Sequence, residues 1–393
     1  MNVCMITDVY FPRVNGVSTS IMTFRRSLKE LGHTSTLVAP DYGDESHDAE
    51  VVRIASRHLF MDPEDRLMKI RRIRDLTACL RRRNFDIIHI QTPFVAHVAG
   101  MRLARALDLP VVETYHTHFE EYLYHYMPLL PKRFMRLLAR MLTRHQAGQV
   151  DELIVPSLAM KEVLRSYGIR TPATILPTGI EVNGFGEGDR KAFSRRYGID
   201  PRRPVLVTVG RVALEKNIGF LLDVVAELRT WLPDVLLIIA GEGPAQARLE
   251  KRITELEIEY NVMMIGYLER GQDLWNCYAA GDLFVFASKT ETQGLVLLEA
   301  MALGVPVVST AELGTRDILC AGKGALVSKP DINDFVEKIM QILSSKSLRE
   351  RLAAEGREYV NSWSAEYMAK RLIDFYSRII QERGTQACRR QSA

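Results

Sequence analysis

Two glutamates, Glu291 and Glu299, lie eight positions apart with Gly294 and an apolar run between them. A short buried strand is expected at 282–287. Gly294 would then begin a helix whose free N–H groups point at the loop carrying Glu291, and such a helix start is a natural seat for phosphate. Glu299 lies about one and a half turns further along, so the two carboxylates can reach different parts of one ligand. Taken alone, a dipole partner and a solvated helix residue explain the pair equally well.

Two cations follow a second expected strand, at 204–209. Arg211 and Lys216 lie in the segment 210–217, beside the start of the next helix. An arginine fork and a lysine point charge together suit a diphosphate, although two solvated surface cations are the simpler alternative. No Asp-x-Asp triplet occurs in the chain, so a divalent ion that bridges the diphosphate is not indicated. We expect protein cations to stabilise a departing nucleoside diphosphate instead.

The first half of the chain contributes a glycine and a histidine. The Asn15-Gly16 pair lies between a strand and a helix and lets the backbone approach a ligand closely, but an ordinary turn explains it at least as well. His116 ends the strand expected at 110–116, on the side where doubly wound sheets bind ligands. We therefore favour a functional role for His116. Asp8 and Gln91 also fall near strand ends.

The segment 132–145 has the pattern of a basic amphipathic helix. Its cations recur every four residues, and apolar residues cover much of the remainder. Such a helix can lie on an anionic membrane, or its apolar side can pack on the protein's own sheet. The pattern fits both hypotheses equally, and the preceding aromatic-rich loop favours the membrane. The candidate membrane or acceptor residues are Tyr122, Tyr126, Lys132, Arg136, Arg140 and Arg144.

Strands and helices alternate along the whole chain, which predicts an α/β protein with parallel sheets. We expect two doubly wound, Rossmann-like domains that face each other across a cleft. The first domain is expected at 1–182 and the second at 183–365, with the glycine-rich stretch 181–188 as the linker. A basic helix is expected at 66–83. Residues 384–393 are expected to form a disordered tail.

Composition excludes several classes of protein. The 393 residues are 47% hydrophobic and 25% charged, which is ordinary for a soluble globular protein. No apolar run reaches the length of a membrane span, and the N-terminus reads as a first strand instead of a signal peptide. Five cysteines without a Cys-x-x-Cys motif indicate a reduced compartment and no structural zinc. A net charge of +4 is too small to indicate nucleic acid. The prediction is a cytoplasmic protein.

Together these motifs resemble the family 4 retaining glycosyltransferases of the GT-B fold. The resemblance covers nearly the whole chain: the Asn15-Gly16 loop, Thr114-Tyr-His116, the segment 210–217, Gly241-Glu-Gly-Pro244 and the segment 288–308. It implies that the last helix, at about 366–383, crosses back onto the first domain. One departure is visible, because many members have histidine where this chain has Gln91. We treat the departure as minor, since donor binding does not depend on it.

The resemblance also implies roles for site residues. Arg211 and Lys216 would bind the donor diphosphate and stabilise the leaving group. Glu299 would bind the ribose hydroxyls, Glu291 the donor sugar, and the backbone amides of Gln293, Gly294 and Leu295 would face the donor. His116 would lie near the anomeric centre and Gly16 near the phosphates. No cofactor or metal is implied.

Within this family the chain looks closest to the branch that glucosylates diacylglycerol or mannosylates related lipids. The similar features are the segments 12–17 and 115–122 and the basic helix after them. They imply retaining transfer of a hexose from a nucleotide diphosphate sugar to a lipid acceptor, by a peripheral protein on the inner face of the cell membrane. UDP-glucose is the first choice of donor and GDP-mannose the second, the latter with a lipid or a soluble polyol or sugar as acceptor. A nucleotide-sugar epimerase or a binding protein of the same fold is the rival class.

Overall fold

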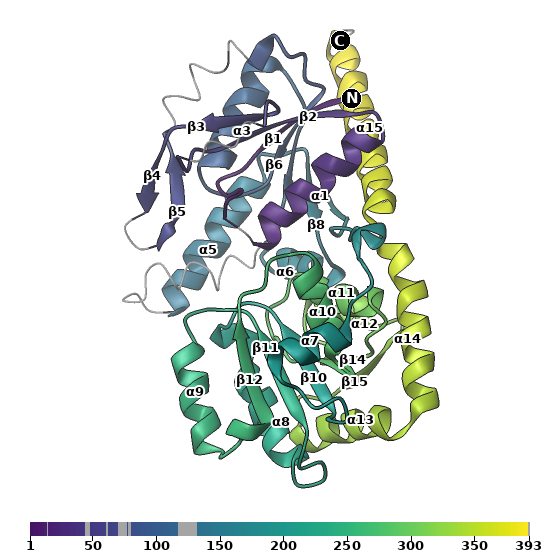
Figure 1. The fold of residues 1–393 in the computed structure, drawn as a ribbon. Helices are drawn as coiled ribbons and strands as arrows, with labels where there is room; N and C mark the ends of the chain where they lie inside the picture. The colour runs from purple at the N-terminus through teal and green to yellow at the C-terminus, as the bar shows by residue number, and fades with distance from the viewer. Residues whose placement is uncertain are drawn as a thin grey trace. The chain divides into compact units, whose positions relative to one another are not determined.

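We analysed a computed structural model, which describes residues 1–13, 15–43, 48–59, 62–69, 77, 80–116 and 132–391. The chain divides into two compact units (Figure 1). Unit 1 comprises Met1–Gly179 together with Ala365–Ala393, and unit 2 comprises Ile180–Ser364. The boundary lies three residues before the 182/183 boundary that the sequence suggested.

Unit 1 is built on a seven-stranded parallel sheet with the order β3-β2-β1-β6-β7-β8-β9. The order reverses between β1 and β6, which makes this pair the topological switch point, where doubly wound sheets bind ligands. The strands are β1 (Asn2–Ile6), β2 (Thr34–Pro40), β3 (Val51–Ile54), β6 (Ile87–Ile90), β7 (Val111–Thr114), β8 (Glu152–Val155) and β9 (Ala173–Ile175).

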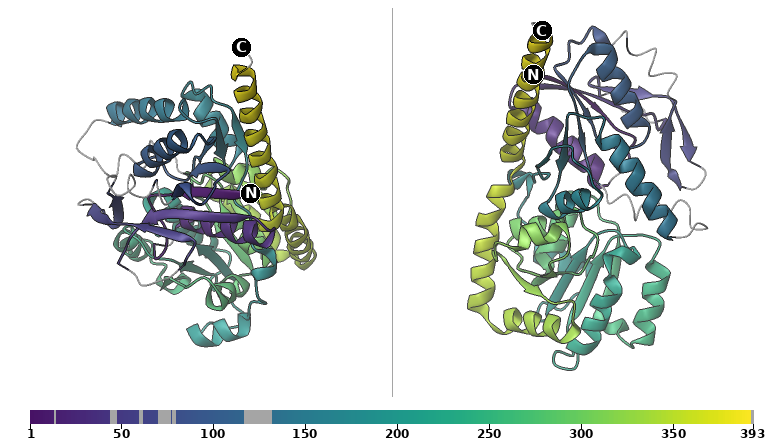
Figure 2. Two further views of the ribbon diagram at one scale, coloured as in Figure 1. Left: turned by 90° about the horizontal axis from the view of Figure 1, so that it is seen from above. Right: turned by 180° about the vertical axis from the view of Figure 1, so that it is seen from behind.

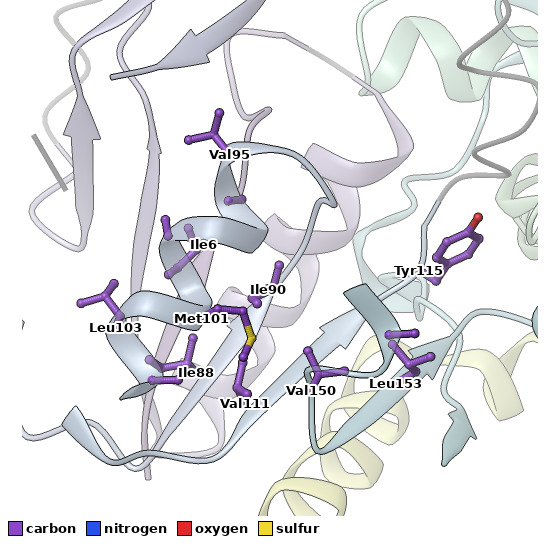
Figure 3. Packing of buried hydrophobic residues seen from close by; sticks show 14 of the residues in the cluster. Ile6, Ile88, Ile90, Val95, Met101, Leu103, Val111, Tyr115, Val150 and Leu153 are labelled. Atoms are coloured by element: carbon purple, nitrogen blue, oxygen red, sulfur yellow. The ribbon is translucent and has the colours of Figure 1, made fainter. Parts of the chain in front are cut away.

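Helices cover both faces of this sheet. On one face α3 (Val95–Leu107), α5 (Lys132–Ala147) and α6 (Leu158–Ser166) contribute to a buried cluster with strand residues such as Ile6, Ile88 and Ile90 (Figure 3). His89 points to the opposite face because side chains alternate along a strand. There it meets α15 (Ala365–Gln391), which packs against α1 (Gly16–Glu30). Met1 lies beside Ser377 of α15, so the first strand and the last helix of the chain lie together (Figure 2).

Unit 2 is built on a six-stranded parallel sheet with the order β12-β11-β10-β13-β14-β15. Its switch point lies between β10 and β13. The strands are β10 (Val205–Val209), β11 (Leu236–Ala240), β12 (Val262–Gly266), β13 (Leu283–Phe286), β14 (Val307–Thr310) and β15 (Ala325–Ser328).

Each face of the second sheet carries its own apolar core. One core joins the sheet to α8 (Ile218–Leu228), α9 (Gln246–Glu255) and α13 (Ile332–Ser344). The other core joins it to five helices: α7 (Arg190–Tyr197), α10 (Gln272–Ala280), α11 (Leu295–Ala302), α12 (Gly314–Leu319) and α14 (Lys346–Val360). Helices thus cover both faces of the sheet, and the carboxyl ends of its strands are where a doubly wound sheet binds ligands.

The glycine-rich stretch 181–188, expected as a linker, belongs to unit 2 and packs on α10. The Phe185 and Trp275 rings meet edge to face at 5.8 Å. The Gln272 side chain donates to the Glu187 carbonyl oxygen at 2.9 Å. These contacts fix the segment onto the helix that follows β12.

Two expected elements differ in the structure. The helix expected at 66–83 is wrong at its start, because β5 (Asp62–Met68) pairs antiparallel with β4 (Ser56–Leu59). The Arg66 guanidinium lies 5.5 Å from the Tyr42 ring centroid, a distant contact that residue spacing does not indicate. The disorder expected at 384–393 is wrong for residues 384–391, because α15 continues to Gln391, while 392–393 lie outside the described residues. Arg383 pairs with Asp108 at 3.0 Å, and most of the following residues are good helix formers.

Candidate functional site

The switch point of unit 2 joins the two loops that the sequence singled out. One loop follows β10 and contains Arg211 and Lys216, and the other follows β13 and contains Glu291. β10 and β13 are neighbours in the sheet. The Asn217 side-chain amide donates to the Ala287 carbonyl oxygen at 3.2 Å, which ties one loop to the other.

Lys216 and Glu291 form an ion pair between these loops. Lys216 ends the short 3-10 helix Leu214–Lys216, and its Nζ donates to Glu291 Oε1. The side chains are only 24% and 17% exposed, so the pair is largely withdrawn from water. Arg211 is exposed, and no ion pair of Arg211 occurs within the described part of the chain. The structure thus places both cations at the same strand end, as the spacing predicted.

The N-terminus of α11 lies directly after Glu291. Its N-cap is Gly294, which lies in the left-handed region at φ +97° and, being glycine, has no side chain to cap the helix. A Cβ on Gly294 would lie 2.8 Å from Thr315 Cγ2, so the position is closed to larger residues. The first N–H groups of α11 have no acceptor within the helix. A helix start of this kind suits an anion, and the donor contacts expected of Gln293, Gly294 and Leu295 stay a prediction.

Glu299 is buried inside α11, at 4% exposure. Arg270 Nη2 donates to its Oε1, and the Tyr278 hydroxyl donates to its Oε2 at 2.8 Å. The solvated helix residue that the sequence left open is therefore wrong for Glu299. Sequence reasoning missed both Arg270 and Tyr278. The one signal in the sequence was the position of Arg270 in the loop after the strand expected at 262–265.

A glycine-bearing loop buttresses the Arg211 segment. Val212 N donates to the Glu242 carbonyl oxygen at 2.8 Å, and Ala245 N donates to the Val212 carbonyl oxygen at 3.0 Å. A Cβ on Gly241 would collide with the Gly210 carbonyl oxygen. The Gly241-Glu-Gly-Pro244 motif thus lets two strand exits lie backbone to backbone, which fixes the path of the chain at Arg211.

In unit 1, the loop after β1 leads to a capped helix. The Asn15 side chain accepts from Val17 N at 3.0 Å and Ser18 N at 2.9 Å, so it caps α1. Gly16 is the first residue of α1, and a Cβ built on it would meet nothing within 4 Å. The protein's own packing therefore gives no reason for glycine at this position. A ligand that approaches the start of α1 would be such a reason.

His116 follows β7 and is hydrogen-bonded to the strand end beside it. Its Nε2 lies 2.9 Å from Gln91 Oε1, so the residue that departs from the family pattern is the partner of His116. Burial lowers the pKa of His116 to about 4, which leaves the ring neutral at pH 7. His116 therefore offers a hydrogen bond and not a charge.

Two other polar residues of this sheet, Asp8 after β1 and His89 within β6, have structural roles. Asp8 accepts from Thr92 Oγ1 at 2.7 Å and from Ala96 N at 3.1 Å, at the start of α3. His89 bridges the Tyr376 hydroxyl and Thr114 Oγ1, each at 2.6 Å. It therefore ties α15 to the sheet, as expected for a histidine in the middle of a strand.

The amphipathic helix α5 packs through small residues and exposes large ones. Ala139, Thr143 and Ala147 are buried. The exposed side chains are Phe134 (53%), Leu137 (57%), Met141 (61%) and Leu142 (40%). The hypothesis that these four side chains pack on the protein's own sheet is therefore wrong.

The basic residues of α5 are described only in part. Arg140 and Arg144 are exposed, and the Arg140 guanidinium lies 5.0 Å from the Tyr167 ring centroid. The side chains of Lys132 and Arg136, and all of Tyr122 and Tyr126, lie outside the described residues. Among the helices that can be described, none has the length and apolar character needed to cross a membrane.

Comparisons with known proteins agree on one family. A family model described as Glycosyltransferase Family 4 matches residues 14–183, and one described as Glycosyl transferases group 1 matches residues 189–359. The alpha-monoglucosyldiacylglycerol synthase of Streptococcus pneumoniae is 30% identical over 96% of this chain and 85% of its own length. A GDP-mannose-dependent alpha-mannosyltransferase of Mycobacterium tuberculosis is 26% identical over 98% of this chain and 99% of its own. The structure of Anabaena HepE in complex with UDP-glucose matches with a TM-score of 0.75 at 16% identity, over 96% of this chain and all of that one, and shows the same fold.

Proposed function

The chain belongs to the family 4 glycosyltransferases of the GT-B fold, and we propose that it transfers a hexose from a nucleotide diphosphate sugar to a lipid acceptor. One observation carries the donor half of this proposal. Two cations, a helix N-terminus without a side-chain cap and two carboxylates gather at the switch point of unit 2. That set matches the diphosphate, sugar and ribose of a nucleotide sugar.

The diphosphate binds Arg211, Lys216 and the first N–H groups of α11. The Lys216–Glu291 pair must separate when a donor enters, because Lys216 Nζ turns to the phosphates and Glu291 to the sugar hydroxyls. As the bond to the sugar breaks, negative charge grows on the leaving diphosphate. Fixed cations and N–H dipoles stabilise that charge without reorganising, which lowers the barrier.

The sugar is transferred with retention of its anomeric configuration. The bond from the anomeric carbon to the diphosphate oxygen breaks first, through an oxocarbenium-like state. The acceptor hydroxyl attacks from the face that the nucleotide leaves, and its proton passes to the departing phosphate oxygen. This route needs no protein nucleophile. For unit 1 we propose, from the family resemblance, that His116, neutral and held by Gln91, hydrogen-bonds the sugar and that Gly16 lies near the phosphates.

The acceptor half of the proposal rests on α5. At 3.6 residues per turn, Phe134, Leu137 and Met141 fall within about 60° of one another around the helix, next to Arg140 and Arg144. Exposed apolar side chains flanked by arginines suit the surface of an anionic bilayer, where a lipid acceptor lies. We infer that α5 attaches the enzyme peripherally to such a surface, on the cytoplasmic side.

The donor is proposed to be UDP-glucose and the acceptor diacylglycerol. The name of the Streptococcus pneumoniae relative, an alpha-monoglucosyldiacylglycerol synthase, supports glucose as the sugar and diacylglycerol as the acceptor. The mannosyltransferase from Mycobacterium tuberculosis keeps GDP-mannose as the second candidate. Both relatives match over nearly the whole chain, so the donor must be chosen by experiment.

The test is release of nucleoside diphosphate from each donor, with and without vesicles of diacylglycerol and an anionic phospholipid. We expect release from UDP-glucose that rises at least tenfold when diacylglycerol is present. Stimulation of GDP-mannose instead would replace the donor. Donor hydrolysis at the same rate with and without lipid would refute the proposed lipid acceptor. Conversion of the donor to an epimer would refute the proposed transferase activity.

Membrane attachment is tested separately with Leu137→Ser and Met141→Ser together. We expect vesicle binding to fall roughly tenfold or more, since two exposed apolar side chains no longer insert. Trp231→Ser is the matched control, because Trp231 is 68% exposed and lies on unit 2. Equal vesicle binding of the double variant and the wild type would refute the role of α5.

A further inference from the structure

The carboxylate of Glu299 is held at both of its oxygens by residues to which no role has been given. Arg270 Nη2 donates to Oε1 and the Tyr278 hydroxyl to Oε2, the latter at 2.8 Å. A carboxylate offers about four acceptor sites. Two direct partners therefore fix the plane of the group and still leave acceptor capacity for a ligand.

Burying a carboxylate costs free energy unless a positive charge and hydrogen bonds compensate it. The Glu299 side chain is 5% exposed and Tyr278 is fully buried. A buried carboxylate in an apolar core is unfavourable without a cation and hydrogen bonds. Arg270 supplies the positive charge, and its side chain is 43% exposed, so it spans from the carboxylate to solvent.

In its hydrogen bond to Glu299, the Tyr278 hydroxyl acts as the donor. Burial, together with the Glu299 carboxylate beside it, raises the pKa of its phenol well above the ordinary value. The hydroxyl thus keeps its proton at every working pH. Glu299 cannot rotate without breaking this bond, and α10 and α11 are locked together through it.

The elements behind the two donors are themselves braced. Arg270 lies in the loop between β12 and α10, and Tyr278 lies near the end of α10. The first segment of unit 2 is hydrogen-bonded to α10 at two places. The Gln272 side chain donates to the Glu187 carbonyl oxygen, and the Asn276 side chain accepts from Asp189 N at 2.7 Å. The position of Glu299 is therefore set by a rigid frame that involves three separate parts of unit 2.

From this geometry we propose that Arg270 and Tyr278 are positioning residues for ribose recognition: they hold the Glu299 carboxylate in the orientation that accepts both vicinal hydroxyls of the donor ribose. The inference rests on the proposed function, which assigns the ribose to Glu299. It predicts that the two residues control discrimination between ribonucleotides and deoxyribonucleotides. Neither residue needs to touch the nucleotide.

The experiment measures affinity by calorimetry for UDP and 2′-deoxy-UDP, and for GDP and 2′-deoxy-GDP. The wild type should prefer the ribonucleotide about tenfold to a hundredfold, or about 1.4–2.7 kcal/mol, since the deoxynucleotide loses one hydrogen bond to a charged group. Glu299→Gln should lose most of this preference. Arg270→Met and Tyr278→Phe should each reduce it severalfold, with little change in affinity for the deoxynucleotide.

Two further variants separate positioning from general damage. Arg270→Lys keeps the charge and should restore part of the preference, although it cannot reproduce the arginine geometry. Lys216→Met is the matched control, because it should weaken both nucleotides of a pair equally. A purely structural role for Arg270 would also weaken both equally.

The outcomes distinguish a failure of the positioning role from a failure of the proposed function on which it rests. If neither UDP nor GDP binds, or if Glu299→Gln keeps the wild-type preference, the ribose assignment itself fails. If Glu299→Gln loses the preference while folded Arg270→Met and Tyr278→Phe both retain it, only the positioning role is refuted.

Discussion

Replacing Lys216 by methionine separates a catalytic lysine from a structural one. Lys216→Met keeps the length of the side chain and removes its charge. The change takes away one cation from the proposed diphosphate site, and it also leaves Glu291 without its partner. The two consequences differ in size and can be measured independently.

The stability effect follows from the exposure of the pair. With side chains 24% and 17% exposed, the pair lies between a solvent-exposed ion pair and a buried one. Breaking an exposed pair costs about 0–1 kcal/mol, and breaking a buried one about 3–5. We therefore expect Lys216→Met to destabilise unit 2 by about 1–3 kcal/mol. At about 2–4 °C per kcal/mol for a unit of this size, Tm should fall by roughly 2–12 °C.

The catalytic effect is larger. Loss of one fixed group that stabilises transition-state charge costs about 10²–10³ in kcat. Glu291→Gln removes the unpaired charge that Lys216→Met leaves behind. The double variant should therefore recover stability but remain about 10²-fold slower than Glu291→Gln alone.

The assay is nucleoside diphosphate release at saturating donor, with chemical unfolding followed on the same protein samples. The single variants, the double variant and the wild type form one cycle. If Lys216→Met costs less than about tenfold in kcat within the Glu291→Gln background, the lysine only holds the loop in place. That result would refute the assignment of Lys216 to the leaving group.

Three other predictions concern residues of the two units. Gly16→Val should leave Tm unchanged within about 1 °C and lower kcat/KM at least tenfold, since a Cβ at Gly16 meets no atom of the described residues within 4 Å; unchanged activity would refute its place beside the donor. Gly294→Ala, with φ +97° at the site, should lower Tm instead. For His89, burial lowers the pKa to about 3, so the folded protein resists protonation and loses stability as pH falls from 6.5 toward 3. Unfolding by urea should therefore show the wild type losing roughly 2 kcal/mol relative to His89→Gln between pH 7.5 and 5. A constant difference would contradict this.

Residues at strand ends were predictable from the sequence. Arg211, Lys216, Glu291 and His116 each follow an apolar run, and parallel strands present their carboxyl ends at one edge. The pattern of single strands thus placed Arg211, Lys216 and Glu291 at one edge of the unit 2 sheet, and His116 at the corresponding edge of the unit 1 sheet. Their roles with a donor remain predictions.

Residues that act through distant partners were not predictable. Arg270 lies 29 positions before Glu299, and nothing in the spacing indicates that they meet. Gln91 looked like a minor departure from the family pattern until its amide was found on His116. The helix expected at 66–83 overlaps the last three residues of β5, where antiparallel pairing with the preceding strand β4 overrides local periodicity.

The most direct test follows the sugar itself. UDP-glucose labelled with ¹³C in its glucose is incubated with the protein and diacylglycerol vesicles, and the lipid phase is extracted and examined by NMR. The account predicts labelled glucose in the lipid phase, joined through an α linkage. Label that never enters the lipid phase while UDP is released, or a β-linked product, would contradict retaining transfer to a lipid.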